Sequence, residues 1–112
     1  MQHSPSETQW IAETNDQVRQ TLLRDYLVVT AGIDQLSAQT KARIFREIET
    51  FSDFNPDNDP HQEHDFGMVE VDGQKVFFKF DYFDNGLQMH SPDVLNRAVT
   101  RRVLTIMLAE EY

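Results

Sequence analysis

The sequence of 112 residues contains no cysteine and only four glycines. The lack of cysteine excludes a disulfide scaffold and any metal site built on thiolates, and it is typical of proteins in a reducing cytoplasm. No apolar run approaches the roughly 20 residues of a membrane-spanning helix, and the first residues do not have the pattern of a signal peptide. We therefore expect a cytoplasmic protein that makes no membrane contact and folds as a single domain over residues 1–112.

Basic residues are also scarce, with 10 Lys and Arg against 19 Asp and Glu, which gives a net charge of −9. Residues 47–72 contain no Lys or Arg at all. Such a segment repels nucleic-acid phosphates and attracts basic proteins or cations, so we expect no direct binding of nucleic acid. The alternative is a charge run that only keeps a loop solvated. The predicted partner-binding acidic surface consists of Glu47, Glu49, Asp53, Asp57, Asp59, Glu63 and Asp65.

The first half of the chain predicts two helices and one short strand. Ser4 and Glu7 form a capping-box pattern, which favours a helix over residues 6–23. The β-branched run at 25–30 predicts a strand. Ser37 is a good N-cap for the next helix. The apolar stripe of that helix is expected at Ile44, Phe45, Ile48 and Phe51.

The middle of the chain predicts a β-hairpin. Asp72 and Gly73 favour a two-residue type I′ turn, which would pair Glu70 with Lys75. After this turn, apolar residues alternate with mixed ones, as in a strand with one buried face. Asn85-Gly86 is a second turn signal, so residues 87–90 are expected to return as a third strand. The buried face is expected at Val76, Phe78, Phe80 and Tyr82.

The last segment predicts a helix from about residue 96 to residue 110, because Val99, Val103, Ile106 and Met107 recur with helical spacing. Its residues Val103, Ile106 and Met107 are expected to cover the hairpin. The predicted fold class is α+β, a small antiparallel meander of three to four strands packed on one face by N-terminal, middle and C-terminal helices. The exposed basic cluster is expected at Arg97, Arg101 and Arg102.

Histidines and carboxylates suggest a metal site as an alternative to a purely structural role. Extending the two turn registers places His64 and His90 on either side of Asp81, where the side chains would converge. Imidazole and carboxylate are ligands that zinc and manganese accept. A hydrogen-bonded ladder on the sheet surface would account for the same pattern. The candidate metal ligands are His61, His64, Asp81 and His90.

Several stretches together resemble a bacterial family known as domain of unknown function 3768. These are NPDNDPH at 55–61, EHDFG at 63–67, FKFDYFD at 78–84, SPD at 91–93 and TRRVLTIMLAEEY at 100–112. The resemblance covers about residues 11–112 and implies a shared fold and a setting on plasmids and other mobile elements, but no activity. His90 stands where members usually have Gly, so the resemblance implies no role for it.

Taken together, these features predict a small acidic accessory protein of mobile elements. We expect it to bind a basic, nucleic-acid-handling host protein and to inhibit a host defence system, as anti-CRISPR or anti-restriction proteins do. The alternative is a small metal-binding protein or metal-dependent enzyme that uses the His/Asp/Glu cluster. A regulatory homodimer is the third hypothesis. No catalytic residue is predicted, and the only cofactor considered is the divalent metal of the alternative.

Overall fold

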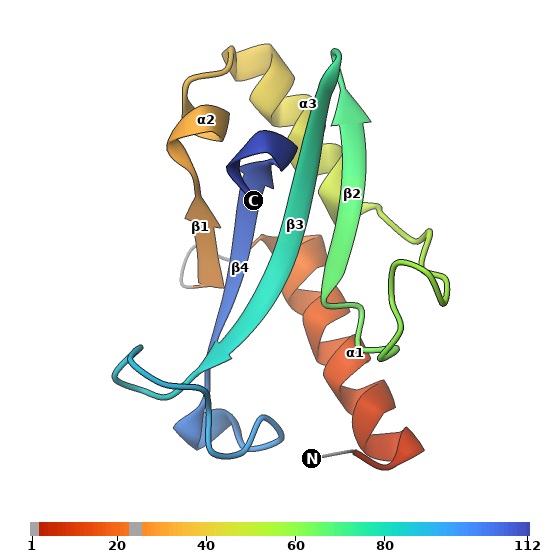
Figure 1. Ribbon diagram of the computed structural model, residues 1–112, viewed down its shortest axis with the longest axis vertical. Coiled ribbons are helices and arrows are strands. Elements are labelled where there is room, and N and C mark those ends of the chain that lie inside the picture. Colours follow the sequence, from red (N-terminus) through yellow and green to blue (C-terminus); the bar gives the residue numbers. More distant parts are fainter. Residues whose placement is uncertain (1–2, 23–25) are drawn as a thin grey trace.

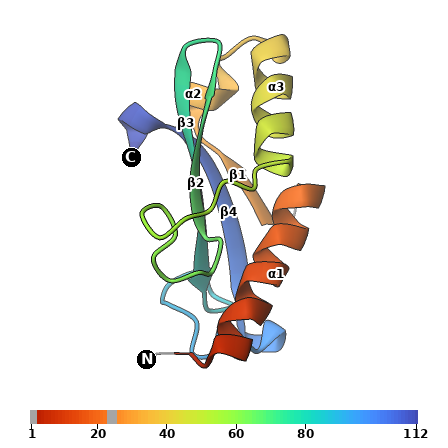
Figure 2. The ribbon, with the colours of Figure 1, turned by 90° about the vertical axis from the view of Figure 1, so that its right-hand side faces the viewer.

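The computed structural model describes residues 3–22 and 26–112 and contains a four-stranded sheet with two helices on one face (Figure 1, Figure 2). The fold class is α+β, as predicted. The elements are, in chain order, α1 (Pro5–Thr21), β1 (Leu27–Val29), α2 (Ala31–Asp34), α3 (Ala38–Glu49), β2 (Phe66–Val71), β3 (Gln74–Phe83), η2 (Arg97–Val99), β4 (Arg101–Leu108) and η3 (Ala109–Glu111).

The two long helices begin where the sequence predicts. Ser4 caps α1 through a complete capping box with Glu7. Ser37 caps α3 by accepting a hydrogen bond from the backbone N–H of Thr40. These caps satisfy backbone N–H groups that have no partner inside the helix. Both helices then direct their apolar side chains at the sheet, and Ile44 and Ile48 of α3 are fully buried.

The hairpin of β2 and β3 has the predicted register. Glu70 pairs with Lys75 and Met68 pairs with Phe77. Asp72 and Gly73 both have positive φ, 51° and 79°, as a type I′ turn requires. The hairpin is therefore determined by local turn chemistry.

The last segment differs from the prediction, because residues 101–108 form the strand β4 rather than a helix. β4 lies in the centre of the sheet, antiparallel to β3 on one side and parallel to β1 on the other, in the order β1-β4-β3-β2. A central strand has neighbours on both edges, so a dense apolar run suits it as well as it suits a helix. The helical spacing of Val99, Val103, Ile106 and Met107 therefore did not indicate a helix.

Two further predictions about the sheet are wrong. Residues 87–90 form no strand, and His90 makes only an isolated bridge to Phe83. The sheet is mixed rather than purely antiparallel, because β1 joins β4 in parallel. The start of the predicted strand at 25–30 includes Asp25, which lies outside the described residues.

The predicted buried face of β3 is confirmed. Val76, Phe78, Phe80 and Tyr82 are at most 9% exposed and face α1 and α3. Their neighbour in β4 is Ile106, which pairs with Phe78. Val103 and Met107, which we expected on this face, alternate to the other one. No helix in the part of the chain that the structure describes is long and apolar enough to cross a lipid bilayer.

Candidate functional site

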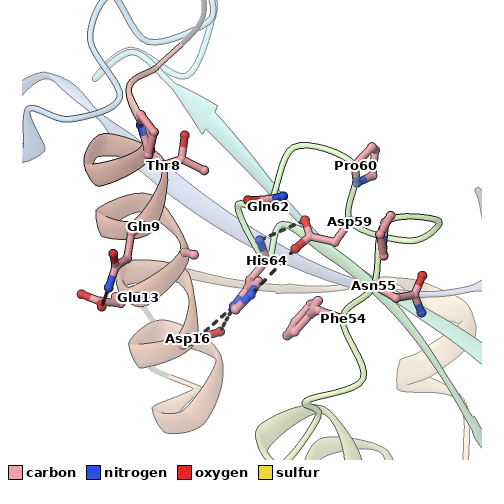
Figure 3. Close-up of a pocket in the computed structure, with 13 residues that line it drawn as sticks. Thr8, Gln9, Glu13, Asp16, Phe54, Asn55, Asp59, Pro60, Gln62 and His64 are labelled. Atoms are coloured by element: carbon pink, nitrogen blue, oxygen red, sulfur yellow. Dashed lines mark hydrogen bonds and ion pairs between the residues drawn. The ribbon is translucent and has the colours of Figure 1, made fainter.

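A groove of about 820 Å³ separates α1 from the acidic loop, which we define as residues 52–64 (Figure 3). Three carboxylates line it, and none of the described lining residues is Lys or Arg. Phe54, Pro56 and Pro60 add apolar surface on the loop side. The carboxylates are Glu13 and Asp16 from α1 and Asp59 from the loop.

His64 closes the groove between the loop and the helix. Its Nδ1 lies 3.0 Å from both carboxylate oxygens of Asp16, and its Nε2 lies 3.8 Å from Asp59 Oδ2. The backbone N–H of His64 donates to Asp59 Oδ1 over 3.2 Å. The imidazole also stacks on Phe54, with ring centroids 4.0 Å apart and an interplanar angle of 2°. These contacts hold the end of the loop against α1.

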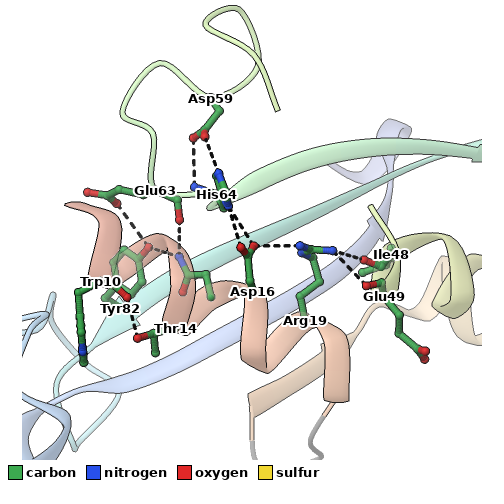
Figure 4. A network of polar contacts seen from close by, with 11 residues as sticks. Trp10, Thr14, Asp16, Arg19, Ile48, Glu49, Asp59, Glu63, His64 and Tyr82 are labelled. Carbon is green, nitrogen blue, oxygen red and sulfur yellow. Dashed lines mark hydrogen bonds and ion pairs between the residues drawn. The ribbon is translucent and has the colours of Figure 1, made fainter. Parts of the chain in front are cut away.

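Arg19 extends this network to the other helix (Figure 4). Its Nη2 donates to Asp16 Oδ1 over 2.9 Å, and its Nη1 donates to the carbonyl oxygen of Ile48 over 2.7 Å. Carbonyls in the last turn of a helix have no partner inside the helix and carry partial negative charge, so the buried guanidinium is well placed there. Asp59, His64, Asp16 and Arg19 thus form one continuous chain of contacts from the loop to the end of α3.

A second network centres on Asn15, which is completely buried. Its Nδ2 donates to the hydroxyl of Tyr82 over 2.8 Å and to the carbonyl oxygen of Glu63 over 3.0 Å. Its Oδ1 accepts a 2.7 Å hydrogen bond from Arg102 Nε. One amide side chain therefore links α1, the acidic loop, β3 and β4.

Burial changes the pKa of the acids at the end of the acidic loop. Burial raises the pKa of Glu63, and the negative charge of Asp65 raises this pKa further. Burial also raises the pKa of Asp65 and of the Tyr82 hydroxyl. Ionised oxygens at these positions lose contact with water, and this loss favours the protonated form.

In the structure, some members of the predicted acidic surface are exposed and the others are buried or partly buried. Glu47, Asp53 and Asp57 are exposed and available to a partner. Asp59 is only 3% exposed, and its oxygens face His64. The remaining members, Glu49, Glu63 and Asp65, are partly buried. The exposed Glu13 of α1, which the sequence reasoning left out, lines the groove together with Asp59.

The predicted convergence of His64, Asp81 and His90 is wrong. The hairpin register holds only as far as Asp65, whose carbonyl oxygen accepts from Phe80 N–H, and the chain then leaves the sheet at His64 with φ of 54°. Asp81 pairs with Val103 on the face away from the helices and forms a 3.1 Å ion pair with Lys79.

The other two candidate ligands, His90 and His61, have surroundings that differ from those of His64 and Asp81. His90 lies edge-on to the ring of Tyr82, and His61 is exposed on the loop. Among the residues that the structure describes, no group of three or more His, Asp or Glu side chains is spaced to hold a metal ion.

Sequence reasoning missed the buried polar residues and placed Arg102 on the surface, whereas it is 5% exposed. Asn15 and Arg19 are four and eight residues after Ile11, on the buried stripe of α1, and this spacing was the signal that could have identified them. For Arg102 the signal was that it lies two residues before Leu104, and residues two apart in a strand point to the same face. Arg97 and Arg101 are exposed, as predicted.

The lining of the groove combines carboxylates, one imidazole and apolar side chains. Both ring nitrogens of His64 already face carboxylates, and Thr8 carries the only hydroxyl among the described lining residues. A basic side chain fits this lining, because its methylene groups can pack on Phe54 and Pro56 while its charged end reaches a carboxylate.

A comparison with models of protein families matches residues 29–111 to DUF3768, described as a protein of unknown function. The matched residues include α3, the acidic loop and the strands β2, β3 and β4, whereas α1 and most of β1 lie before them. No curated protein and no solved structure matches the chain.

Proposed function

Because the chain belongs to the DUF3768 family of proteins of unknown function, membership brings no activity with it, and we propose a function from the groove. The protein is a cytoplasmic binding factor that recognises a basic segment of another protein. The observation that carries this proposal is a groove with three carboxylates and apolar rings, without a Lys or Arg among its described lining residues.

The arrangement of charges supports binding at the rim of this groove. Glu13 on α1 and Asp53 and Asp57 on the loop are exposed. Within the groove, Asp16 is already paired with Arg19 and His64. Glu13, which lines the groove, and the exposed loop acids Asp53 and Asp57 form no ion pair with the other described residues. Charge of one sign around a concave, partly apolar surface raises the association rate of an oppositely charged partner.

The partner that we propose is a host protein that handles nucleic acid. Such proteins present basic surfaces to phosphates, and an acidic protein with a net charge of −9 competes with nucleic acid for the same surface. The specific function proposed is inhibition of a host defence system, of the anti-CRISPR or anti-restriction type, by a protein carried on mobile elements. The metal-dependent alternative stays a hypothesis, and no group of three or more His, Asp or Glu side chains among the described residues is spaced to carry it.

A charge-matched pair of variants tests the groove. The groove variant combines Glu13→Gln, Asp53→Asn and Asp57→Asn. The control variant removes the same amount of charge at exposed acids elsewhere, Asp34→Asn, Glu70→Gln and Glu110→Gln. Binding of an arginine-rich peptide is measured at low and at high salt. We expect the groove variant to bind severalfold more weakly and with a smaller salt dependence, and the control to bind as the parent does.

Equal weakening of both variants would show that net charge, not the groove, attracts the peptide. The defence hypothesis is tested separately, by adding the parent protein and the groove variant to cleavage reactions of purified CRISPR and restriction nucleases. Inhibition by the parent that the groove variant lacks supports the hypothesis, and undiminished cleavage with the parent contradicts it for those nucleases.

A further inference from the structure

A second cavity, of about 370 Å³, lies on the other flank of α1 from the acidic groove. The groove is lined by residues such as Gln9, Glu13 and Asp16, whereas the cavity is lined by Gln17 and Thr21. Two arginines, Arg97 and Arg102, complete the cavity, and none of its described lining residues is acidic. A basic cavity is unexpected in a chain with a net charge of −9. Its size is in the range of small-molecule sites.

Arg102 is a buried cation that has no counter-ion among the residues that the structure describes. It is 5% exposed, and its Nε donates to Asn15 Oδ1 over 2.7 Å. Its Nη2 is buried and has no hydrogen-bond partner among the described residues, and none of their carboxylates forms an ion pair with it. Burial, and to a smaller extent the positive charge of Arg97, lowers the pKa of this guanidinium. An unpaired buried charge is costly, so a bound anion would stabilise it.

The other polar groups of the cavity indicate which side chains are available for a ligand. The hydroxyls of Thr14, Thr21 and Thr100 already donate to backbone carbonyls, over 2.8 Å in each case. The cationic end of Arg97 lies 5.6 Å from the centre of the Trp10 ring, which helps to orient it at the edge of the cavity. The donors that remain are the two guanidinium groups, the hydroxyl of Tyr26 and the amide of Gln17.

We infer that this cavity binds a small organic anion whose carboxylate or phosphate group lies between Arg97 and Arg102. The anion supplies the charge that Arg102 lacks, and guanidinium groups match the planar or tetrahedral oxygens of both groups. Val18 provides apolar surface for the rest of the ligand. This site is independent of the proposed function, since it shares no lining residue with the acidic groove.

Titration with two probes, inorganic phosphate and benzoate, tests the site at constant ionic strength. Backbone amide shifts of α1 and β4 are followed by NMR in the parent protein, in Arg97→Gln and in Arg101→Gln. Arg101 is the matched control, because it is exposed and points to the opposite side of β4 from Arg102. Loss of one charged hydrogen-bond donor is expected to weaken saturable binding about tenfold or more in Arg97→Gln and not in Arg101→Gln.

The choice of Arg97 keeps the test interpretable, because its side chain is exposed and its replacement is expected to leave the fold intact. Saturation with phosphate alone or with benzoate alone supports the site and identifies the group that it prefers. Absence of saturation with both probes overturns the proposal. Equal weakening in Arg97→Gln and Arg101→Gln overturns it as well, since the anion would then respond only to general charge.

Discussion

The Nδ1 atom of His64 lies 3.0 Å from each oxygen of the Asp16 carboxylate, across 48 residues of sequence. This contact joins the end of the acidic loop to the middle of α1. Because Arg19 binds the same carboxylate and reaches the end of α3, the contact also couples the loop to the second helix. The shape of the acidic groove therefore depends on a few polar contacts between segments that are far apart in the chain.

Replacing His64 with Ala is expected to release the loop from α1. The variant loses the contact with Asp16 and the stacking on Phe54, and Asp59 loses the imidazole beside it. We expect a decrease of about 1–3 kcal/mol in the free energy of unfolding, since removal of one partner leaves polar groups unsatisfied. Hydrogen exchange should also accelerate at the backbone amides of Asp59 and of residues 61–64.

His61→Ala is the control for this variant, because His61 is exposed on the same loop. It is expected to change neither the unfolding free energy nor the exchange rates beyond error. If His64→Ala behaves in the same way, the contacts of His64 do not hold the loop.

Local chemistry made much of the fold predictable. The capping box at Ser4, the N-cap at Ser37 and the turn at Asp72 and Gly73 each depend on residues within a few positions of one another. The buried face of β3 follows from simple alternation. These features needed no knowledge of the rest of the chain.

Tertiary context decided the features that sequence reasoning got wrong. Residues 101–108 are compatible with a helix or a strand by spacing, and only their position between β1 and β3 makes them a strand. The register at His64 failed because that residue has positive φ and leaves the sheet to meet Asp16. Pairs such as Asn15 with Arg102, 87 residues apart, have no local signal.

The strand β3 supplies a direct test of the core. Phe80 is 5% exposed and packs in the cluster between the sheet and the helices. Phe80→Ala removes a large buried side chain and leaves a cavity, so we expect a loss of about 3–5 kcal/mol, measured by chemical denaturation. Met68→Ala, at a position that is 47% exposed on β2, is expected to change stability by less than about 0.5 kcal/mol. A cooperative Phe80→Ala variant with the parent's midpoint would contradict the packing described.

A close approach at Gly67 gives a second test. A Cβ atom at this position would lie 2.4 Å from a ring carbon of Phe78 and 3.0 Å from Phe51. The Phe78 ring is fully buried and cannot move aside freely. Gly67→Ala is therefore expected to destabilise the protein by about 1–3 kcal/mol through overpacking.

Gly86→Ala is the matched control for Gly67→Ala. The nearest atom to a Cβ at Gly86 is 3.7 Å away, which is an ordinary contact, and its φ is not in the left-handed region. Its thermal midpoint should stay close to that of the parent. Equal midpoints for the two alanine variants would mean that β2 can move away from Phe78 at little cost.

The raised pKa of Glu63 predicts how stability varies with pH. Burial shifts this pKa above the ordinary value of 4.5, and the charge of Asp65 adds to the shift. The folded protein therefore keeps the Glu63 proton at a pH where the unfolded chain has released it. In that window the folded state binds more protons, so the free energy of unfolding falls as pH rises from about 4.5 through the raised pKa. Asp65, whose pKa burial raises above 3.8, acts in the same direction.

Glu63→Gln isolates this contribution, because glutamine keeps an oxygen that can accept from the Tyr82 hydroxyl but cannot ionise. Other acids act in the opposite direction, since hydrogen bonds lower the pKa of Glu7 and Glu111, so the comparison is between variant and parent at each pH. Thermal midpoints should agree below about pH 4 and diverge above it, with Glu63→Gln the more stable protein at neutral pH. Glu110→Gln, an exposed replacement outside the network, should follow the parent throughout. A Glu63→Gln midpoint below that of the parent at neutral pH would show that the ionised carboxylate stabilises the fold instead.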